Sequence, residues 1–369
     1  MSVRNKPKVR YAVVGLGHIA QAAVLPAFEN AENNSELVAF VSDDPVKRQQ
    51  LGRRYNVVST YTYKEYNALL KNGSIDAVYI ALPNNMHRDF TVRAARAGIH
   101  VLCEKPLAVT AKDCEAMIEA CAENKVKLMT AYRLHFERAN LDAIEIAKSG
   151  KLGELRIFNS VFGYQLKAGN IRAQKKLGGG AVSDIGIYCI NAARYLFRDE
   201  PLEVSAYTLR PDRRFRDVDG VTSAMMLFPK NRIASFTCSF DSADVATYSI
   251  LGTKGKLRLE MAYEYATGSC MDVSIGKKNQ QRTYEKRDQF GAELVYFSDC
   301  VLRNRNPEPS GEEGLADVRI IQAIQESART RLPVKIRRVE KRTRPSRKQA
   351  ISRPAVKKQP LVHAESGSE

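Results

Sequence analysis

Two short segments of this chain carry residue types that could do chemistry together. The first is a glycine-rich turn, Gly15-Leu-Gly-His-Ile-Ala20, and the second is Glu104-Lys105-Pro106, which closes a short apolar strand. Glycines at this spacing, between a strand and a helix, let the pyrophosphate of a dinucleotide approach the backbone. A lysine at the carboxyl end of a later strand lies at the sheet edge where ligands bind. Together the segments predict hydride transfer beside a nicotinamide ring.

The end of the second predicted strand, Leu37–Val41, bears on which dinucleotide would bind. An acidic residue there would accept a hydrogen bond from the ribose 2′-hydroxyl of NAD and repel the additional phosphate of NADP. The position after the strand is Ser42, and Lys47 follows within two helical turns. This arrangement favours NADP. Asp43 and Asp44 stand between them, so NAD stays possible.

A third segment, Leu82-Pro-Asn-Asn-Met-His87, follows another predicted strand and reaches the same sheet edge. Pro83 turns the chain away from the sheet, and Asn84 can hydrogen-bond a ribose or a carboxamide. His87 either faces the ligand or caps the following helix, and both interpretations stay open. The expected cofactor contacts are therefore Gly15, Leu16, Gly17, His18, Ile19, Ser42, Lys47, Leu82, Pro83, Asn84, His87, Glu104 and Lys105.

A second polar cluster follows three consecutive glycines, Gly178–Gly180. Asp184, Tyr188 and Asn191 are spaced i, i+4, i+7, so on a helix they share one face. A carboxylate, a phenol and an amide on one stripe of an apolar helix suit a polyhydroxylated ligand, and the glycines would let the loop approach it. The alternative is a core tyrosine and an aspartate that caps the helix, and spacing alone slightly favours this alternative.

The elements that position these residues fall into two groups. Residues 1–131 alternate strand and helix, which predicts a doubly wound parallel sheet of Rossmann type. Residues 132–336 read as an α/β domain whose period-two strands and short turns predict an open, mostly antiparallel sheet. The predicted strands of this second part are Leu155–Gly163, Leu202–Leu209, Val221–Phe228, Ile233–Phe240 and Thr247–Leu251, and its predicted helices are Leu141–Lys148, Asp184–Phe197 and one capped by Ser310 that runs to Arg331.

Composition excludes several classes of protein. The chain has 369 residues, 44% apolar and 27% charged, and no run approaches the roughly 18–20 apolar residues of a membrane span. The first ten residues lack an apolar signal core, so we expect a cytoplasmic protein. The seven cysteines have no metal-type spacing, which predicts buried reduced thiols and no metal site.

The net charge of +17 is unevenly distributed. Residues 337–369 hold ten Lys or Arg and three Glu, no aromatic residue and three prolines. This composition predicts a basic, disordered tail. Such a tail could bind nucleic acid, but a solvated extension is the favoured interpretation, so we expect no nucleic-acid partner.

Taken in their order along the chain, the motifs described above resemble those of the glucose–fructose oxidoreductase and inositol dehydrogenase family of nicotinamide-dependent oxidoreductases. The resemblance spans residues 9–333 and also rests on Ala-Tyr-Arg133 and the closing Gly311-Glu-Glu-Gly-Leu-Ala-Asp. It is nearest to the glucose–fructose oxidoreductase-like branch, because Tyr188 stands where many inositol-type members carry histidine. The resemblance implies a homodimer or homotetramer formed through the outer face of the second sheet.

The resemblance also implies roles for individual residues. Lys105 and Tyr188 become the catalytic pair, Asp184 orients the substrate, and Arg133 and Arg172 lie near the cofactor or substrate. Ile171 stands where relatives often have an aromatic residue, and the N-terminal arm is short. The implied reaction is NADP-dependent oxidation of a cyclic aldose at C1. Alternatives are an NAD-dependent cyclitol or amino-sugar dehydrogenase and a non-catalytic ligand-sensing regulator.

Overall fold

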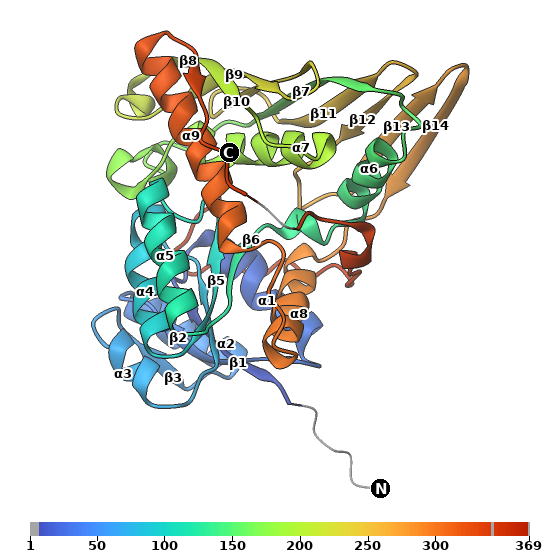
Figure 1. The fold of residues 1–369 in the computed structure, drawn as a ribbon. Coiled ribbons are helices and arrows are strands. Elements are labelled where there is room, and N and C mark those ends of the chain that lie inside the picture. Colours follow the sequence, from blue (N-terminus) through green and yellow to red (C-terminus); the bar gives the residue numbers. More distant parts are fainter. Residues whose placement is uncertain (1–6, 341–342, 368–369) are drawn as a thin grey trace, which may run out of the picture.

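The computed structural model describes residues 7–340 and 343–367. Two sheets dominate the described chain, one parallel and built from the first third, the other mixed and built from the rest (Figure 1). None of the helices in these residues combines the length and apolar character needed to cross a bilayer. The two-part α/β architecture predicted from the sequence is confirmed. The division at 131/132 and 336/337 stays a prediction.

The first sheet is parallel, with strand order β3-β2-β1-β4-β5-β6. Its strands are β1 (Val9–Val14), β2 (Ser35–Val41), β3 (Ser59–Tyr61), β4 (Ala77–Ile80), β5 (His100–Glu104) and β6 (Leu128–Ala131). Its helices are α1 (Leu25–Ala31), α2 (Pro45–Tyr55), α3 (Tyr66–Lys71), α4 (His87–Arg96) and α5 (Ala111–Glu123). The strand order reverses between β1 and β4, which creates a ligand crevice at their carboxyl ends.

Local capping explains where some of these helices begin. The Asp44 side chain accepts hydrogen bonds from the backbone N–H of Val46 at 2.9 Å and of Lys47 at 3.0 Å. Thr110 Oγ1 accepts from the N–H of Asp113 at 3.1 Å, as its spacing predicts. Ser310 is the N-cap residue of α9 (Gly311–Thr330), as predicted, but its side chain makes no capping hydrogen bond there.

The second sheet has strand order β14-β13-β12-β11-β7-β10-β9-β8-β15 and is antiparallel except for the β7–β10 pair. Its strands are β7 (Leu155–Gly163), β8 (Glu203–Leu209), β9 (Val221–Phe228), β10 (Arg232–Ser239), β11 (Val245–Gly252), β12 (Gly255–Glu260), β13 (Ser269–Ile275), β14 (Lys278–Tyr284) and β15 (Val334–Lys335). The last four were not predicted. Strand β14 reads Lys-Asn-Gln-Gln-Arg-Thr-Tyr and has no apolar alternation to reveal it.

Helices cover one face of this sheet and leave the other open (Figure 1). The covering helices are α6 (Arg138–Lys148), α7 (Ile187–Phe197) and α9 (Gly311–Thr330), whereas α8 (Gln289–Leu302) lies elsewhere. Helix α8, which was not predicted, returns to the first sheet and packs against α1. There Ser298 Oγ lies 2.7 Å from the Tyr11 hydroxyl. The second half of the chain thus completes the core of the first.

An ion-pair network fixes α7 against α9. Arg194 of α7 is fully buried and donates at 2.5 Å to both Glu313 Oε1 and Asp317 Oδ1 of α9. Asn191 Nδ2 donates to Asp317 Oδ2 at 2.7 Å. Because a buried charge is stable only when paired and hydrogen-bonded, this network defines how α7 is oriented.

The tail differs from its predicted disorder. Residues 343–367 follow the surface of the molecule and contact both parts of it, while residues 341–342 and 368–369 lie outside the described residues. The tail residues that make these contacts follow no periodic spacing in the sequence. For example, Val362 is buried in the core around α1, and Arg344 pairs with Glu200 at 2.9 Å. Composition reports only the average character of such a segment, so it cannot reveal these isolated anchors.

Candidate active site

A cleft of about 1000 Å³ opens between the carboxyl ends of the first sheet and the covered face of the second. Of the residues predicted from the sequence to face a ligand, all line this cleft except His87 and Asn191. The first sheet contributes the glycine turn and the ends of β2, β4 and β5, while the second half contributes Arg172, Asp184 and Tyr188. The topology therefore brings together two motif groups that lie far apart in the sequence.

The two glycines of the turn have different reasons to lack a side chain. Gly15 has φ +93°, and a Cβ there would lie 2.5 Å from the carbonyl oxygen of Ala81. At Gly17 a Cβ would meet nothing within 4 Å. Gly15 thus permits the close passage of β1 beside β4, and Gly17 leaves open space in the cleft where a phosphate can approach the backbone.

The end of β2 presents Ser42 and Lys47 to the cleft. The two neighbouring carboxylates are engaged elsewhere. Asp43 Oδ1 accepts from the backbone N–H of Tyr63 at 2.8 Å, and Asp44 caps α2 and contacts His363 Nδ1 at 3.1 Å. Neither carboxylate lines the cleft in the described residues.

Asp184 is the centre of a charged cluster. Its Oδ1 accepts from Lys105 Nζ at 3.1 Å, its Oδ2 pairs with Arg172 Nε at 2.8 Å, and Lys105 Nζ also donates to its backbone carbonyl at 2.7 Å. Burial alone would raise the pKa of Asp184, but the positive charges of Lys105 and Arg172 outweigh burial and lower it to about 2. Burial alone would lower the pKa of Lys105, and Asp184 reverses that shift, so the pKa is raised.

Two cations lie close to the Tyr188 ring. Lys105 Nζ is 4.8 Å from the centroid of this ring, and Arg133 Cζ is 5.1 Å from it. Arg133 Nη2 donates to the Tyr188 hydroxyl at 3.3 Å. Arg133 is itself held by Gln289 of α8 and the carbonyl of Tyr263. Two positively charged side chains therefore lie within about 5 Å of the Tyr188 ring.

Glu104 lines the cleft behind Lys105. Its Oε1 accepts from the Tyr79 hydroxyl at 2.9 Å, and the same hydroxyl lies 3.3 Å from Glu293 Oε2 of α8. Burial raises the pKa of Glu104 and raises that of Glu293 further. The Glu104 carboxyl is therefore anchored to the protein interior beside the lysine.

His87 is not placed in the cleft, so the structure does not support a cofactor contact there. The ring is fully buried, with Nε2 2.9 Å from the Leu82 carbonyl and Nδ1 3.0 Å from that of Pro106. Burial lowers its pKa, and a neutral imidazole donates to one of these carbonyls at a time. His87 thus ties together the two loops that carry Asn84 and Lys105.

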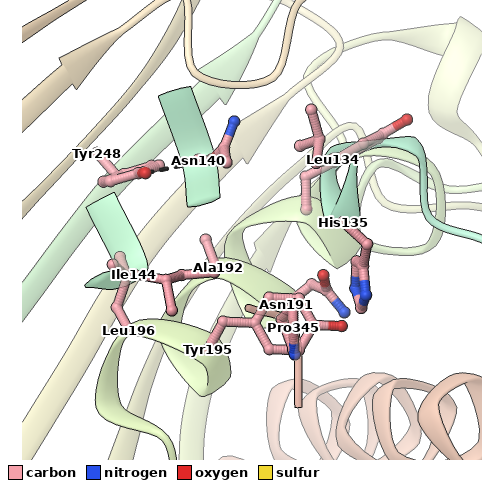
Figure 2. A pocket seen from close by; sticks show the side chains of 11 residues that line it. Leu134, His135, Asn140, Ile144, Asn191, Ala192, Tyr195, Leu196, Tyr248 and Pro345 are labelled. Atoms are coloured by element: carbon pink, nitrogen blue, oxygen red, sulfur yellow. Dashed lines mark hydrogen bonds between the residues drawn. The ribbon is translucent and has the colours of Figure 1, made fainter. Parts of the chain in front are cut away.

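The predicted polar stripe on α7 divides between two sites. Asp184 and Tyr188 line the cleft, whereas Asn191 points to α9 and lines a separate cavity of about 20 Å³ beside His135 and Pro345 (Figure 2). Residues Val182–Gly186 form a π-helical turn before α7, so the angular spacing of an ideal α-helix does not hold there. With a volume of about 20 Å³, this cavity has room for roughly one water molecule and is too small for a sugar.

The glycines before this turn fit against protein atoms. A Cβ at Gly179 would lie 2.2 Å from the Arg172 carbonyl oxygen, and one at Gly180 would lie 2.2 Å from Asp219 Oδ1. The sequence predicted that these glycines let their loop approach a ligand. In the structure Gly179 and Gly180 let the loop pack tightly against Arg172 and Asp219, and this packing holds Arg172 beside Asp184.

Several cleft residues escaped the sequence analysis. Tyr164 donates to Asp184 Oδ2 at 3.3 Å, and Tyr265, Glu264 and Gln289 line the wall near Arg133. Tyr164 directly follows a correctly predicted strand, so its position could have suggested a role. The others lie between or beyond unpredicted elements. In the described part of the chain, no group of three or more His, Cys, Asp or Glu side chains is arranged to hold a metal ion.

Family models settle the wider relationship. The NAD-binding Rossmann domain of the GFO/IDH/MocA oxidoreductase family matches residues 9–132, and the C-terminal domain of the same family matches residues 141–258. This chain belongs to the Gfo/Idh/MocA family. It is an oxidoreductase with an NAD(P)-binding Rossmann domain, as the motif resemblance predicted.

Individual members resemble the chain over most of its length. A D-xylose 1-dehydrogenase [NADP(+)] of Haloarcula marismortui is 32% identical over 89% of this chain and 93% of its own. The crystal structure of an aldose-aldose oxidoreductase from Caulobacter crescentus, complexed with glycerol, is 38% identical with a TM-score of 0.85, covering 89% of this chain and 100% of that chain. A 3-ketoreductase from Actinomadura kijaniata, solved with NADP and TDP-benzene, is 27% identical with a TM-score of 0.80, covering 87% and 98%.

The depressed pKa of Asp184 makes a pH-dependent prediction. A carboxyl whose pKa falls from 3.8 to about 2 on folding stabilises the folded state above pH 4 and loses this contribution as the pH falls toward 2. Asp184→Asn should therefore lower the free energy of unfolding by about 2 kcal/mol at pH 7. That difference should shrink between pH 5 and pH 2 in urea titrations. The exposed Asp217→Asn is the matched control, and a loss independent of pH would contradict the ion-pair account.

Proposed function

We propose that this protein is an NADP-dependent sugar oxidoreductase that transfers hydride between C1 of a cyclic aldose and the nicotinamide. The observation that carries the proposal is the convergence of Lys105, Asp184 and Tyr188 in the cleft that the glycine turn also lines. The relatives named as a xylose dehydrogenase and an aldose-aldose oxidoreductase support the substrate class.

The proposed mechanism assigns the proton to Tyr188. In the proposed step Tyr188 acts as the phenolate, and its oxygen, beside Arg133 and Lys105, accepts the proton of the C1 hydroxyl as hydride leaves C1 and the lactone forms. The bound nicotinamide supplies the hydride acceptor. Lys105 stabilises the negative charge that develops on the sugar oxygen, and Asp184 with Arg172 orients the lysine and the sugar hydroxyls.

The same site can run in the opposite direction. A second sugar carbonyl would then receive the hydride, and Tyr188 would return the proton. If the cofactor stayed bound between the two sugars, the enzyme would couple two half-reactions. The relative named as an aldose-aldose oxidoreductase favours this coupling of an aldose donor to an aldose acceptor.

Two alternatives make different predictions. An NAD-linked cyclitol or amino-sugar dehydrogenase would show a cofactor preference for NAD. A ligand-sensing regulator on the same fold would bind nucleotide without turnover. The presence of both Lys105 and Tyr188 in one cleft favours catalysis over regulation.

Tyr188→Phe tests the proton transfer. The variant keeps the ring contacts with Lys105 and Arg133 but cannot accept a proton, so kcat for aldose oxidation should fall by roughly 10²–10⁴-fold. NADPH affinity, measured by fluorescence titration, should change little. Tyr207→Phe, on an exposed strand of the second sheet, is the control and should retain full activity. Unchanged turnover in the Tyr188 variant would refute this role.

The preference for NADP rests on Ser42 and Lys47 lining the cleft while Asp43 and Asp44 are engaged elsewhere. Lys47→Ala should weaken NADP binding by roughly 10–100-fold, because a charged hydrogen bond contributes about 1.5–3 kcal/mol. NAD binding should stay within about twofold. Calorimetric titration with both dinucleotides measures this, with Lys71→Ala on α3 as control. Equal losses for both cofactors would remove the argument for NADP.

We also propose that two copies associate through the open face of the second sheet. Ile157 on β7 and Met225 and Leu227 on β9 are exposed, and Ile157 and Leu227 both flank Ile233 of β10, the strand between β7 and β9. Apolar rows on an open sheet face are typical of protein interfaces. Met225→Lys with Leu227→Lys should convert a dimer or tetramer to a monomer in analytical ultracentrifugation. A monomeric unmodified protein, or an assembly unaffected by both lysines, would contradict this interface.

A further inference from the structure

The tail is anchored first on the second half of the chain. Arg344 Nη2 pairs with Glu200 at 2.9 Å, and Pro345 lines the small cavity beside Asn191 (Figure 2). Gln349 Nε2 donates to the Glu308 carbonyl at 2.9 Å. These contacts fix the tail before it reaches the Rossmann domain.

The tail then crosses to the Rossmann domain. The N–H of Asp288 donates to the Arg353 carbonyl at 3.1 Å, and Asn30 Nδ2 donates to that of Pro354 at 2.8 Å. Further on, Arg54 of α2 donates to the Pro360 carbonyl at 2.7 Å. The backbone of the tail, rather than its charge, makes these contacts.

Its strongest anchor lies beside the glycine turn. Val362 is buried, its N–H donates to Gln21 Oε1 at 2.7 Å, and its carbonyl accepts from Gln21 Nε2 at 2.9 Å. The same Gln21 amide donates to the carbonyl of Leu16 in the turn at 2.9 Å. One side chain therefore connects the tail directly to the backbone of the predicted phosphate site.

The last described residues reach the opposite wall of the cleft. The Lys167 N–H donates to the Gly367 carbonyl at 3.0 Å, on the loop that also carries Arg172. The tail itself lines the cleft on both sides of Val362, with Val356, Lys357, Lys358, Gln359 and Leu361 before it and Ser366 and Gly367 after it. The tail thus joins the two walls across the space that Gly17, Ser42 and Lys47 also line.

We propose that residues 356–367 form a strap that retains the dinucleotide in the cleft. The inference rests on NAD(P) binding and not on the identity of the sugar. A nucleotide beneath a segment anchored on both walls can leave only after one anchor detaches. Lys357 and Lys358 add two positive charges to the cleft that Lys47 also lines, which suits the phosphates of a dinucleotide.

The test measures release of NADPH without any sugar. The full chain and a variant ending at residue 336 are loaded with NADPH, mixed with excess NADP, and followed by the fluorescence of bound NADPH. The dissociation rate should rise at least about tenfold in the shortened chain, equivalent to about 1.4 kcal/mol. Size-exclusion chromatography should show nucleotide co-eluting with the full chain and absent from the shortened one.

Point variants of the full-length chain test the same proposal if the shortened chain does not fold. Val362→Asp should detach the anchor and accelerate release, whereas Val362→Ile should not. Lys357→Ala with Lys358→Ala should accelerate release in a manner that diminishes at high salt. Lys348→Ala, on the same tail but outside the cleft, is the matched charge control and should release NADPH at the unmodified rate.

The outcomes separate the strap from the proposed function. Equal dissociation rates in the full chain, the shortened chain and Val362→Asp would overturn the strap while leaving the oxidoreductase assignment intact. Faster binding with unchanged release in the shortened chain would make the tail a barrier to entry and would also overturn it. Failure of every form to bind NADPH or NADH would overturn both the strap and the proposed function.

Discussion

The ion pair between Lys105 and Asp184 is the interaction on which the site depends. Lys105 follows β5 of the first sheet, and Asp184 lies in the turn before α7 on the second, with side chains only 13% and 19% exposed. Separating two such groups would leave both charges poorly solvated, at a cost of several kcal/mol. The pair therefore favours one relative placement of the two halves. Because Tyr188 lies one turn after Asp184, the same placement brings the phenol to Lys105.

The charge balance of this cluster follows from a third partner. Arg172 joins Lys105 around the single carboxylate of Asp184, and Arg133 lies 5.1 Å from the Tyr188 ring centroid. The cluster therefore keeps excess positive charge even with Asp184 ionised. Such a field stabilises negative charge that develops on a substrate oxygen. The positioning of the two halves and the electrostatics of the proposed reaction thus come from the same residues.

Sequence patterns predicted what depends on local chemistry. The strand before the glycine turn, the capping of α5 by Thr110 and the alternation in β7 and β9 are encoded within a few residues. The features that were not predicted depend on residues far away in the sequence. Strand β14 is polar throughout, α8 finds its place against α1, and His87 is fixed by carbonyls of two separate loops. The π-helical turn before α7 likewise separated Asn191 from the stripe that ideal spacing predicted.

For the C-terminal tail, amino-acid composition did not indicate the contacts that the structure shows. Its basic, proline-containing sequence satisfies the criteria for disorder, yet its contacts with the Rossmann domain are made largely by backbone carbonyls and one apolar side chain, Val362. Backbone groups are present in every sequence, so no residue pattern announces them. The side chains that donate to these carbonyls, Asn30, Arg54 and Gln21, likewise stand in no sequence motif that would indicate such a contact. The proposed role of the segment follows from its path between two walls of one cleft. That path is visible only in the three-dimensional structure.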